Sequence, residues 1–342
     1  MGLQIGDIIS KKEIEFSDLK GKTLAVDAFN AIYQFLTTIR QADGTPLQDD
    51  NGNITSHLSG LFYRNMKLIL EGVKLVYVFD GDAPKLKAKT HKKRSDAKQE
   101  MREKYEDAKE REDVDAMNKY SKFNVRLDDK KIQESKELLI AMGVAVVQAP
   151  GEGEAQASVL AKNGLVYAVA SQDYDCLMFK SPKFIQNLSM ARRRKTATGY
   201  REVHPQVITL KSVLEELELT QEQLICLGIL SGTDYNPGGI KGLGPKKSLK
   251  IVKEYSSKEE LFNAIETDAK FEKYELDFDW KAIYGEIENP RVDDIETIDF
   301  PQIDKEKIKE ILVQYGFSAD RIDSQLEKLD KIQRDKAQTT LF

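Results

Sequence analysis

The sequence predicts an α/β fold in which a mostly parallel central sheet is flanked by helices. Short, nearly continuous apolar runs rich in β-branched residues recur through the first half of the chain, and segments with helical periodicity separate them. A continuously apolar run is typical of a strand covered on both faces. Strands that alternate with helices form parallel sheets, because a helix is the usual crossover between two parallel strands.

Four apolar runs are expected to form the parallel strands. Their sequences are KTLAVD, KLVYVFD, VAVVQ and LVYAVA, at residues 22–27, 74–80, 144–148 and 165–170. Three segments between them carry apolar side chains at intervals of three and four residues, which predicts helices at 28–40, 56–72 and 128–143. The second and third of these helices end in Gly72 and Gly143, and glycine suits the left-handed residue that closes many helices.

Residues 81–128 interrupt this alternation. They are dense in Lys, Arg, Asp and Glu, and apolar residues stand only at scattered positions such as Leu86, Met101, Tyr105 and Met117. A helix of this kind has no apolar stripe to bury against a core. We therefore expect either a solvated helical insertion or a helical arch over a site, because long insertions in compact domains are often functional.

The chain is expected to be helical after residue 205. Thr220 and Gln223 form a capping-box pair at the start of one helix, and a glycine-rich hairpin precedes the next. Residues 220–255 therefore resemble a helix-hairpin-helix, whose backbone amides contact the phosphate oxygens of a duplex. The candidate DNA-binding residues of this region are Gly242, Gly244, Lys246 and Lys247.

The charge of the chain leaves the question of a nucleic-acid partner open. The net charge over 342 residues is −5, whereas phosphate-binding proteins usually carry an excess of Lys and Arg. The basic residues are nevertheless concentrated, and a local cluster matters more than the sum. The clusters are KLKAKTHKKR (85–94), RRRK (192–195) and KGLGPKKSLK (241–250).

Cysteine usage and hydropathy favour a soluble globular protein in a reducing intracellular compartment. Cys176 and Cys226 are too few for a disulfide framework and lack the spacing of a metal site. No apolar stretch approaches the roughly 20 residues that cross a bilayer, and the first residues lack the charged and apolar segments of a signal peptide. We expect no membrane partner and a monomer.

Carboxylates follow three of the predicted strands. Asp27 and Asp80 end the first two strands, and Asp173 and Asp175 follow the fourth. In an open parallel sheet the functional site lies outside the carboxyl ends of the strands, so these side chains are expected to converge. A lone Asp at a strand end is more often a turn former or a helix cap. Three such sites at one edge, with paired acids among them, make that simpler interpretation insufficient.

Three further acids are expected at the same edge. Glu152 and Glu154 stand where the third strand passes through Pro150 into a helix, and Asp234 follows a helix. Seven clustered carboxylates would repel one another by several kcal/mol unless cations neutralised them. Oxygen ligands without His or Cys suit Mg²⁺ or Mn²⁺. Two such ions about 4 Å apart are the usual device for phosphodiester hydrolysis.

Lys87 and Arg94 are the candidate phosphate-binding cations. They stand seven residues apart, a spacing that places both on one face of a single helix, and they closely follow Asp80. A pair of solvated helix residues is the simpler interpretation. Their proximity to the acidic edge makes a catalytic role the competing one.

Five stretches resemble the flap endonucleases in order and spacing: VDAFNAIYQFL, VFDGDAPKLKAKTHKKR, APGEGEAQA, SQDYDCLMF and GTDYNPGGIKGLGPKK. The resemblance covers nearly the whole chain, and the last stretch is similar to the archaeal form. It implies a PIN-like 5′ nuclease fold and a structure-specific 5′ flap endonuclease that also has 5′ to 3′ exonuclease activity. Such an enzyme cuts DNA by two-metal catalysis at junctions of duplex and unpaired strand, in replication (Okazaki fragment maturation) and repair.

The resemblance also implies roles for particular residues. It assigns the seven carboxylates to two Mg²⁺ ions, for which Mn²⁺ substitutes, and it assigns the scissile phosphate to Lys87 and Arg94. It implies that Tyr33 stacks on the adjacent base, although the helical spacing of Tyr33 suits a core position equally well. Residues 81–128 would form the arch. Gly2 matches the amino-terminal glycine that the family places near its site.

The same resemblance implies a single nuclease domain over residues 1–334 and a flexible tail over 335–342. The family docks on a sliding clamp (PCNA) through a C-terminal peptide of the form Gln-x-x-aliphatic-x-x-aromatic-aromatic. Gln338, Leu341 and Phe342 match only the beginning of that peptide. Either the chain is cut short or clamp binding is weakened. The implied location is the cytoplasm or nucleoid of an archaeon.

Two other functions compete with a flap endonuclease. A 5′ exonuclease or junction resolvase would share the fold, but the lack of a long insertion between residues 128 and 144 favours the flap enzyme. A non-catalytic DNA-binding clamp adaptor belongs to a different class. Seven carboxylates beside a phosphate path argue against such an adaptor, because they would weaken its binding to DNA.

Overall fold

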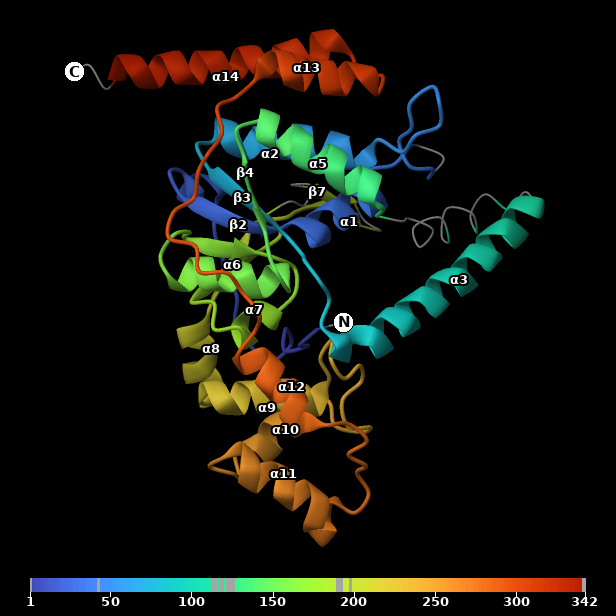
Figure 1. The fold of residues 1–342 in the computed structure, drawn as a ribbon, viewed down its shortest axis with the longest axis vertical. Coiled ribbons are helices and arrows are strands. Elements are labelled where there is room, and N and C mark those ends of the chain that lie inside the picture. Colours follow the sequence, from blue (N-terminus) through green and yellow to red (C-terminus); the bar gives the residue numbers. More distant parts are fainter. Residues whose placement is uncertain are drawn as a thin grey trace.

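The computed structural model describes residues 2–41, 44–111, 127–188, 193–196 and 199–339, together with positions 113, 116 and 120. Within this part of the chain a seven-stranded sheet lies at the centre, with helices on both faces (Figure 1). Five consecutive strands of the sheet are mutually parallel, and the two strands added beyond them on one side join by antiparallel pairing, which confirms the mostly parallel sheet. In spatial order the strands are β1 (Lys12–Glu13), β9 (Gln206–Thr209), β6 (Lys183–Gln186), β5 (Ala168–Ala170), β2 (Thr23–Asp27), β3 (Lys74–Phe79) and β4 (Ala145–Gln148).

The parallel strands are apolar because both of their faces are covered. In β2, Leu24 and Val26 point into one buried cluster and Ala25 points into another on the opposite face, as expected from the two-residue period of a strand. The helices that cover the Leu24 face are α1 (Ala28–Thr38), α2 (Ser56–Leu70), α5 (Asp129–Ala141), α13 (Lys305–Gln314) and α14 (Ala319–Thr339).

A second group of helices contributes to the cluster on the Ala25 face and extends it to one end of the molecule (Figure 1). These are α6 (Gly153–Lys162), α7 (Asp175–Met178), α8 (Leu210–Leu217), α9 (Gln221–Ser231), α10 (Pro245–Val252), α11 (Lys258–Thr267) and α12 (Trp280–Glu288). Short 3₁₀ turns are η1 (Phe16–Leu19), η2 (Lys85–Lys87) and η3 (Ala269–Phe271).

Local signals in the sequence end and start the helices as expected. Gly72 and Gly143 follow α2 and α5 with φ of +85° and +74°, values that suit a residue without Cβ. The Thr220 side chain accepts a hydrogen bond from the Gln223 amide, and the Gln223 side chain accepts one from the Thr220 amide. This reciprocal pair is the predicted capping box at the start of α9.

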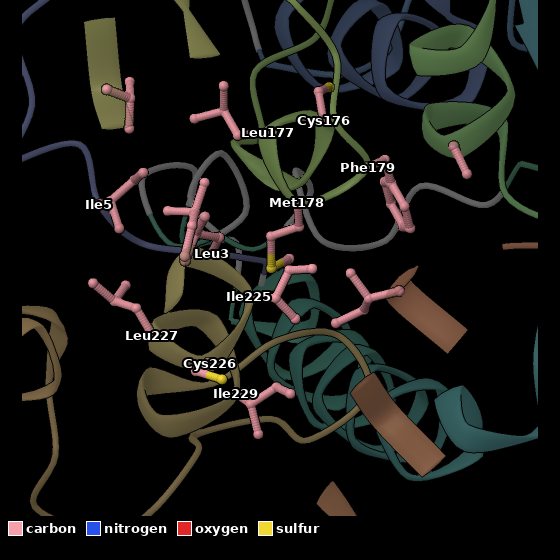
Figure 2. Close-up of a cluster of buried hydrophobic side chains, with 14 of the residues drawn as sticks. Leu3, Ile5, Cys176, Leu177, Met178, Phe179, Ile225, Cys226, Leu227 and Ile229 are labelled. Atoms are coloured by element: carbon pink, nitrogen blue, oxygen red, sulfur yellow. The ribbon is translucent and has the colours of Figure 1, made fainter. Parts of the chain in front are cut away.

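The N-terminal segment is anchored in the core. Leu3 and Ile5 are almost fully buried and lie with side chains of α7 and α9, among them Leu177, Met178 and Ile225 (Figure 2). Burial of two large aliphatic side chains stabilises the segment by about 3–6 kcal/mol. This anchoring fixes the position of the preceding Gly2.

The charged insertion forms a long helix, α3 (Ala88–Glu110), which projects from the body of the molecule (Figure 1). A projecting helix has no core to face, in agreement with the absence of an apolar stripe. Each helix in the described ranges is too short or too polar to span a bilayer. Met117, one of the scattered apolar residues of the insertion, lies outside the described residues.

The structure differs from the sequence-based expectations in three places. The strands β1, β6 and β9 were not predicted, and the chain after residue 205 begins with β9 before it becomes helical. The basic stretch at 192–195 overlaps β7 (Arg193–Thr196), which forms a hairpin with β8 (Gly199–Glu202). The backbone of α14 is helical to Thr339, past the expected start of the tail at residue 335.

A buried polar network joins three helices on the Leu24 face. His57 at the start of α2 is fully buried, and its Nε2 lies 2.9 Å from Oε2 of Glu134 in α5. The hydroxyl of Tyr315, at the end of α13, donates a hydrogen bond of 2.5 Å to Oε1 of the same carboxylate. Glu134 in α5 therefore links the start of α2 to the end of α13 through its two carboxylate oxygens.

We expect Glu134→Gln to lower the free energy of unfolding by about 1.5–3 kcal/mol, the usual range for hydrogen bonds to a charged group. Denaturant unfolding at neutral pH measures the change. Glu137→Gln is the matched control, because Glu137 is exposed on the same helix, and its effect should stay within about 0.5 kcal/mol.

The effect should depend on pH. Burial raises the pKa of Glu134, but the hydrogen bonds from His57 and Tyr315 outweigh burial and hold it below the ordinary value of 4.5. A carboxyl group whose pKa is lower in the folded than in the unfolded protein stabilises the fold at a pH above its unfolded pKa. This stabilisation is lost as the pH falls through the pKa of the folded state. The difference between the native protein and Glu134→Gln should shrink below about pH 4.5. A difference that stays constant to pH 3 would contradict this account.

Candidate active site

The carboxyl ends of the central strands form the edge where the predicted acids lie. In the sheet, β3 and β4 lie on one side of β2, and β5 and β6 lie on the other side of β2. The order of the strands therefore reverses between β2 and β5. A reversal of this kind leaves a crevice at the ends of the two strands. Asp27 ends β2 on one side of the crevice, and Asp173 follows β5 on the other.

Asn30, in the first turn of α1, bridges the two sides of this crevice. Its backbone N–H donates to Oδ1 of Asp27 at 3.0 Å, so Asp27 caps α1. Its side-chain amide donates to Oδ2 of Asp173 at 2.9 Å. Asn30 was not among the predicted site residues. Its position three residues after Asp27 indicates the capping bond, but nothing in the sequence indicates the contact with Asp173.

The turn between β4 and α6 brings Glu152 and Glu154 to the same edge. Glu152 is the N-cap residue of α6, and Glu154 lies in its first turn. The N–H of Gly153 donates to Oδ1 of Asp80 at 2.5 Å, and a Cβ on Gly153 would lie only 2.8 Å from that oxygen. The positive end of the helix thus faces a carboxylate, which is its preferred partner, and only glycine permits this approach.

Asp175 begins α7 and meets the N-terminal segment. The N–H of Leu3 donates to Oδ1 of Asp175 at 2.5 Å. A Cβ at Gly2 would lie 2.2 Å from Oδ2 of that carboxylate, so the position requires a residue without a side chain. The structure therefore places Gly2 directly beside an acid of the predicted site.

Asp234 lies in the loop after α9, where it meets α3 and Lys87. The hydroxyl of Thr90, in α3, donates to the carbonyl oxygen of Asp234. Lys87 Nζ lies 3.7 Å from an Asp234 carboxylate oxygen and 3.0 Å from Oε1 of Glu152. The hydroxyl of Tyr235 also donates to that Glu152 oxygen. Tyr235 and Thr90 were not predicted as site residues, and no sequence signal identified them.

The seven acids, Asn30 and Lys87 line one cleft of about 1630 Å³. Helix α3 supplies part of its wall, including Ser95, Gln99 and Arg102. Of the predicted site residues the cleft contains Gly2, Asp27, Tyr33, Asp80, Lys87, Glu152, Glu154, Asp173, Asp175 and Asp234.

The expected placement of Lys87 and Arg94 on one helix needs correction. Lys87 ends the 3₁₀ turn η2, and α3 begins at the next residue, so Lys87 and Arg94 do not share one α-helix as their spacing suggested. The tighter turn directs Lys87 to the carboxylates. The Arg94 side chain lies outside the described part of the chain.

Burial and mutual repulsion dominate the electrostatics of the acids. Burial raises the pKa of Asp27 to about 8, and the charges of Asp80 and Asp173 add to the shift. Burial raises the pKa of Asp175 to about 7. It also raises the pKa of Glu154 well above its usual range, and Asp27 and Asp173 add to the effect. The ionised forms therefore need a compensating positive charge in the cleft.

Lys87 supplies one such charge. Burial lowers the pKa of Lys87, but the carboxylates of Glu152 and Asp234 outweigh burial and raise it above the usual value. Burial raises the pKa of Glu152, and Lys87 and the Tyr235 hydroxyl oppose that shift. The ammonium group remains charged at neutral pH, but one cation cannot balance seven acids.

The donor set fits a divalent cation in its chemistry. It offers carboxylate oxygens without His, which suits Mg²⁺ or Mn²⁺. In the described residues no three His, Cys, Asp or Glu side chains are placed to hold one ion. The acids instead accept hydrogen bonds from the protein; for example, the hydroxyl of Ser171 donates to Oε1 of Glu154 at 2.6 Å. Ion binding would therefore require these side chains to reorient within the cleft.

The predicted hairpin lies outside the cleft. Gly242 has φ of +89°, Gly244 is the N-cap residue of α10, and the buried Leu243 between them anchors the turn. Lys246 and Lys247 are exposed in the first turn of α10. Backbone amides at a helix start and two lysines together form a surface suited to a phosphate group. Of the predicted clamp residues, Leu341 and Phe342 lie outside the described residues, as does the Gln338 side chain.

Comparison with known proteins agrees with this geometry. Residues 3–101 match the model of the XPG N-terminal domain, and residues 143–234 match the XPG I-region. Flap endonuclease 1 of Pyrococcus furiosus is 48% identical over 344 residues, covering 100% of this chain and 98% of the relative. Flap endonuclease 1 of Hyperthermus butylicus is 45% identical over 341 residues, covering 98% of this chain and 96% of the relative.

Solved structures give the same result. Flap endonuclease-1 from Methanococcus jannaschii is similar with a TM-score of 0.75 and 37% identity, over 98% of this chain and 100% of that chain. The catalytic core of Rad2 in complex with DNA substrate is similar with a TM-score of 0.69 and 26% identity, over 96% and 100%. Full-length identity well above 30%, matched family models and an acidic cleft at the sheet edge together show that this chain belongs to the flap endonuclease family.

Proposed function

We propose that this chain is a metal-dependent, structure-specific nuclease that hydrolyses branched DNA where an unpaired 5′ strand leaves the duplex, with 5′ to 3′ exonuclease activity. The observation that carries the proposal is the convergence of seven carboxylates and Lys87 in one cleft beneath α3. Relatives named flap endonuclease and a Rad2 structure with DNA substrate support the choice of DNA.

We infer that the seven carboxylates hold two Mg²⁺ ions, for which Mn²⁺ can substitute. The all-oxygen donor set and the raised pKa values of Asp27 and Asp175 support this inference, because a cation would relieve the repulsion that raises them. When bound, such ions stabilise the charge that develops on the attacking and leaving oxygens of a phosphodiester.

The remaining cleft residues position the DNA. Lys87 is charged and lies on the cleft wall, so it can turn from Glu152 to a non-bridging phosphate oxygen and stabilise the developing charge there. Arg94, from the arch helix, would act with it. Tyr33 lines the cleft and is partly exposed, which suits stacking on the base beside the scissile phosphate. The hairpin with Gly242, Gly244, Lys246 and Lys247 would hold the duplex.

We further propose that residues 1–334 act as one nuclease domain and that the protein is a monomer. Gln338, Leu341 and Phe342 would contribute to binding a sliding clamp (PCNA). The proposed setting is replication and repair inside an archaeal cell, in the cytoplasm or nucleoid. A non-catalytic clamp adaptor and a 5′ exonuclease or junction resolvase are the alternatives.

End-labelled DNA separates these functions. Incubation with flap, nicked, gapped and four-way DNA in Mg²⁺ should give preferred cleavage of the 5′ flap, and EDTA should stop it. Preferred cleavage of four-way DNA would indicate a resolvase, and binding without cleavage would indicate an adaptor.

Asp173→Ala should abolish cleavage and leave flap-DNA affinity within a few-fold, because it removes an acid of the cleft and no phosphate-binding surface. Rates come from single-turnover cleavage and affinities from fluorescence anisotropy. Asp294→Ala, which changes an exposed acid distant in sequence from the seven, is the control and should cleave normally. Full activity of Asp173→Ala would refute the metal-site assignment.

Lys87→Ala should lower the single-turnover rate by about 10² or more, as expected for the loss of a preorganised charge at the reacting phosphate. Arg94→Ala should have a similar effect. Lys104→Ala is the matched control, because Lys104 lies on α3 and pairs with Glu100 at an exposed site. Equal rates for all three variants would make Lys87 and Arg94 merely solvated residues.

The combined change Lys246→Ala and Lys247→Ala should weaken duplex binding similarly for all sequences and reduce the salt slope of binding by about 2. Cleavage at saturating DNA should survive. Lys162→Ala with Lys211→Ala removes two exposed charges elsewhere and controls for net charge. An unaltered slope in the hairpin variant would place duplex binding elsewhere, with the RRRK stretch as the next candidate.

Extending the chain with residues that complete the clamp peptide should tighten clamp binding by about tenfold or more, because aromatic anchors carry a large share of such binding and about 1.4 kcal/mol suffices for that factor. Calorimetric titration of the clamp with both forms measures the change. Equal affinities would mean that docking uses another surface or that Phe342 suffices, and no binding by either would remove the clamp as a partner.

A further inference from the structure

Tyr235 is held rigidly beside Glu152 and Lys87, two residues that line the cleft. Its N–H donates to Oγ1 of Thr233 at 3.1 Å, and the Thr233 hydroxyl donates to Oδ1 of Asn236 at 2.7 Å. The Asn236 side-chain amide donates in turn to the carbonyl of Ile229 in α9 at 2.7 Å. Thr233 is fully buried and Asn236 nearly so. This satisfied network fixes the loop, so the phenol of Tyr235 has little freedom.

The Tyr235 side chain meets two groups of the proposed catalytic centre. It is only 6% exposed, and its hydroxyl donates to Oε1 of Glu152. Its ring lies beneath Lys87, with Nζ 5.2 Å from the ring centroid, within the range of a cation–π contact. The same Nζ lies 3.0 Å from the Glu152 oxygen that the phenol holds.

In the proposed function Lys87 turns from Glu152 toward a phosphate oxygen. When Lys87 turns toward DNA, Glu152 loses its cationic partner, and the rigid phenol continues to donate to the same oxygen. A carboxylate held by a fixed donor loses less conformational freedom when it binds an ion, so preorganisation favours binding.

We propose that Tyr235 is a positioning residue. Its hydroxyl holds Glu152 in the orientation that an ion requires, and its ring supports Lys87 as the ammonium group moves from Glu152 to the phosphate. The inference rests on the proposed function. It assigns to Tyr235 an action through Glu152 and Lys87, with no contact to the reacting atoms.

Tyr235→Phe isolates the hydroxyl because it retains the ring beneath Lys87. Tyr284→Phe is the matched control. Tyr284 is also buried, at 8% exposure, and its hydroxyl donates to Oε2 of Glu288 at 3.3 Å within α12. Both changes remove a phenol that donates to a carboxylate, but Glu152 lines the cleft, whereas Glu288 is not among the cleft-lining residues.

The experiment measures Mn²⁺ binding without DNA by calorimetry, single-turnover cleavage at saturating DNA with varied Mg²⁺, flap-DNA affinity and thermal stability. We expect Tyr235→Phe to weaken Mn²⁺ binding and raise the half-saturating Mg²⁺ concentration by about tenfold, the effect of losing one hydrogen bond to a charged group. DNA affinity should be unchanged. Tyr284→Phe should bind the ion and cleave as the native protein does.

Native ion binding in Tyr235→Phe would overturn the inference. A loss of thermal stability in Tyr235→Phe without a change in either ion measurement would also overturn it, because the role would then be structural. Failure of the proposed function looks different: the native protein would then leave flap DNA uncut in Mg²⁺, whatever the ion affinity of either variant.

Discussion

The repulsion among buried carboxylates at the carboxyl edge of the sheet is the constraint on which the surrounding structure depends. Burial and neighbouring acids raise the pKa values of Asp27, Asp175 and Glu154 together. Each carboxylate needs a donor or a positive charge to remain ionised at neutral pH. Segments far apart in the chain meet this need: the N-terminal residues, the start of α6, and the turn that carries Lys87.

This requirement explains where glycine is indispensable. The donor to Asp175 is the backbone of the N-terminal segment, and the adjacent Gly2 has no room for a Cβ; the same holds for Gly153 beside Asp80. Backbone amides can approach a carboxylate this closely only where side chains are absent. The aliphatic anchors that follow Gly2 keep the segment in place (Figure 2), so part of the hydrophobic core serves to position the site.

Much of the fold and the set of acids could be predicted from the sequence, because both depend on local patterns. Doubly covered strands are continuously apolar, and acids at strand ends of a parallel sheet must share an edge. The strands β1, β6 and β9, with the sequences KE, KFIQ and QVIT, escaped prediction because they lack the continuous apolar run of the predicted strands, and β9 leads directly into α8. The placement of Lys87 was mistaken because a 3₁₀ turn and an α-helix look alike in a charged sequence.

The sequence by itself determined four of the parallel strands, the helix caps, the charged insertion and the identity of the seven acids, since each follows from residue type and short-range spacing. The tertiary structure alone decided which donor meets which acid. Asn30 reaches Asp173, Tyr235 reaches Glu152 and Leu3 reaches Asp175 across separations of 143, 83 and 172 residues. Such pairings arise when packing brings distant backbone segments together, and no periodicity along the chain records them.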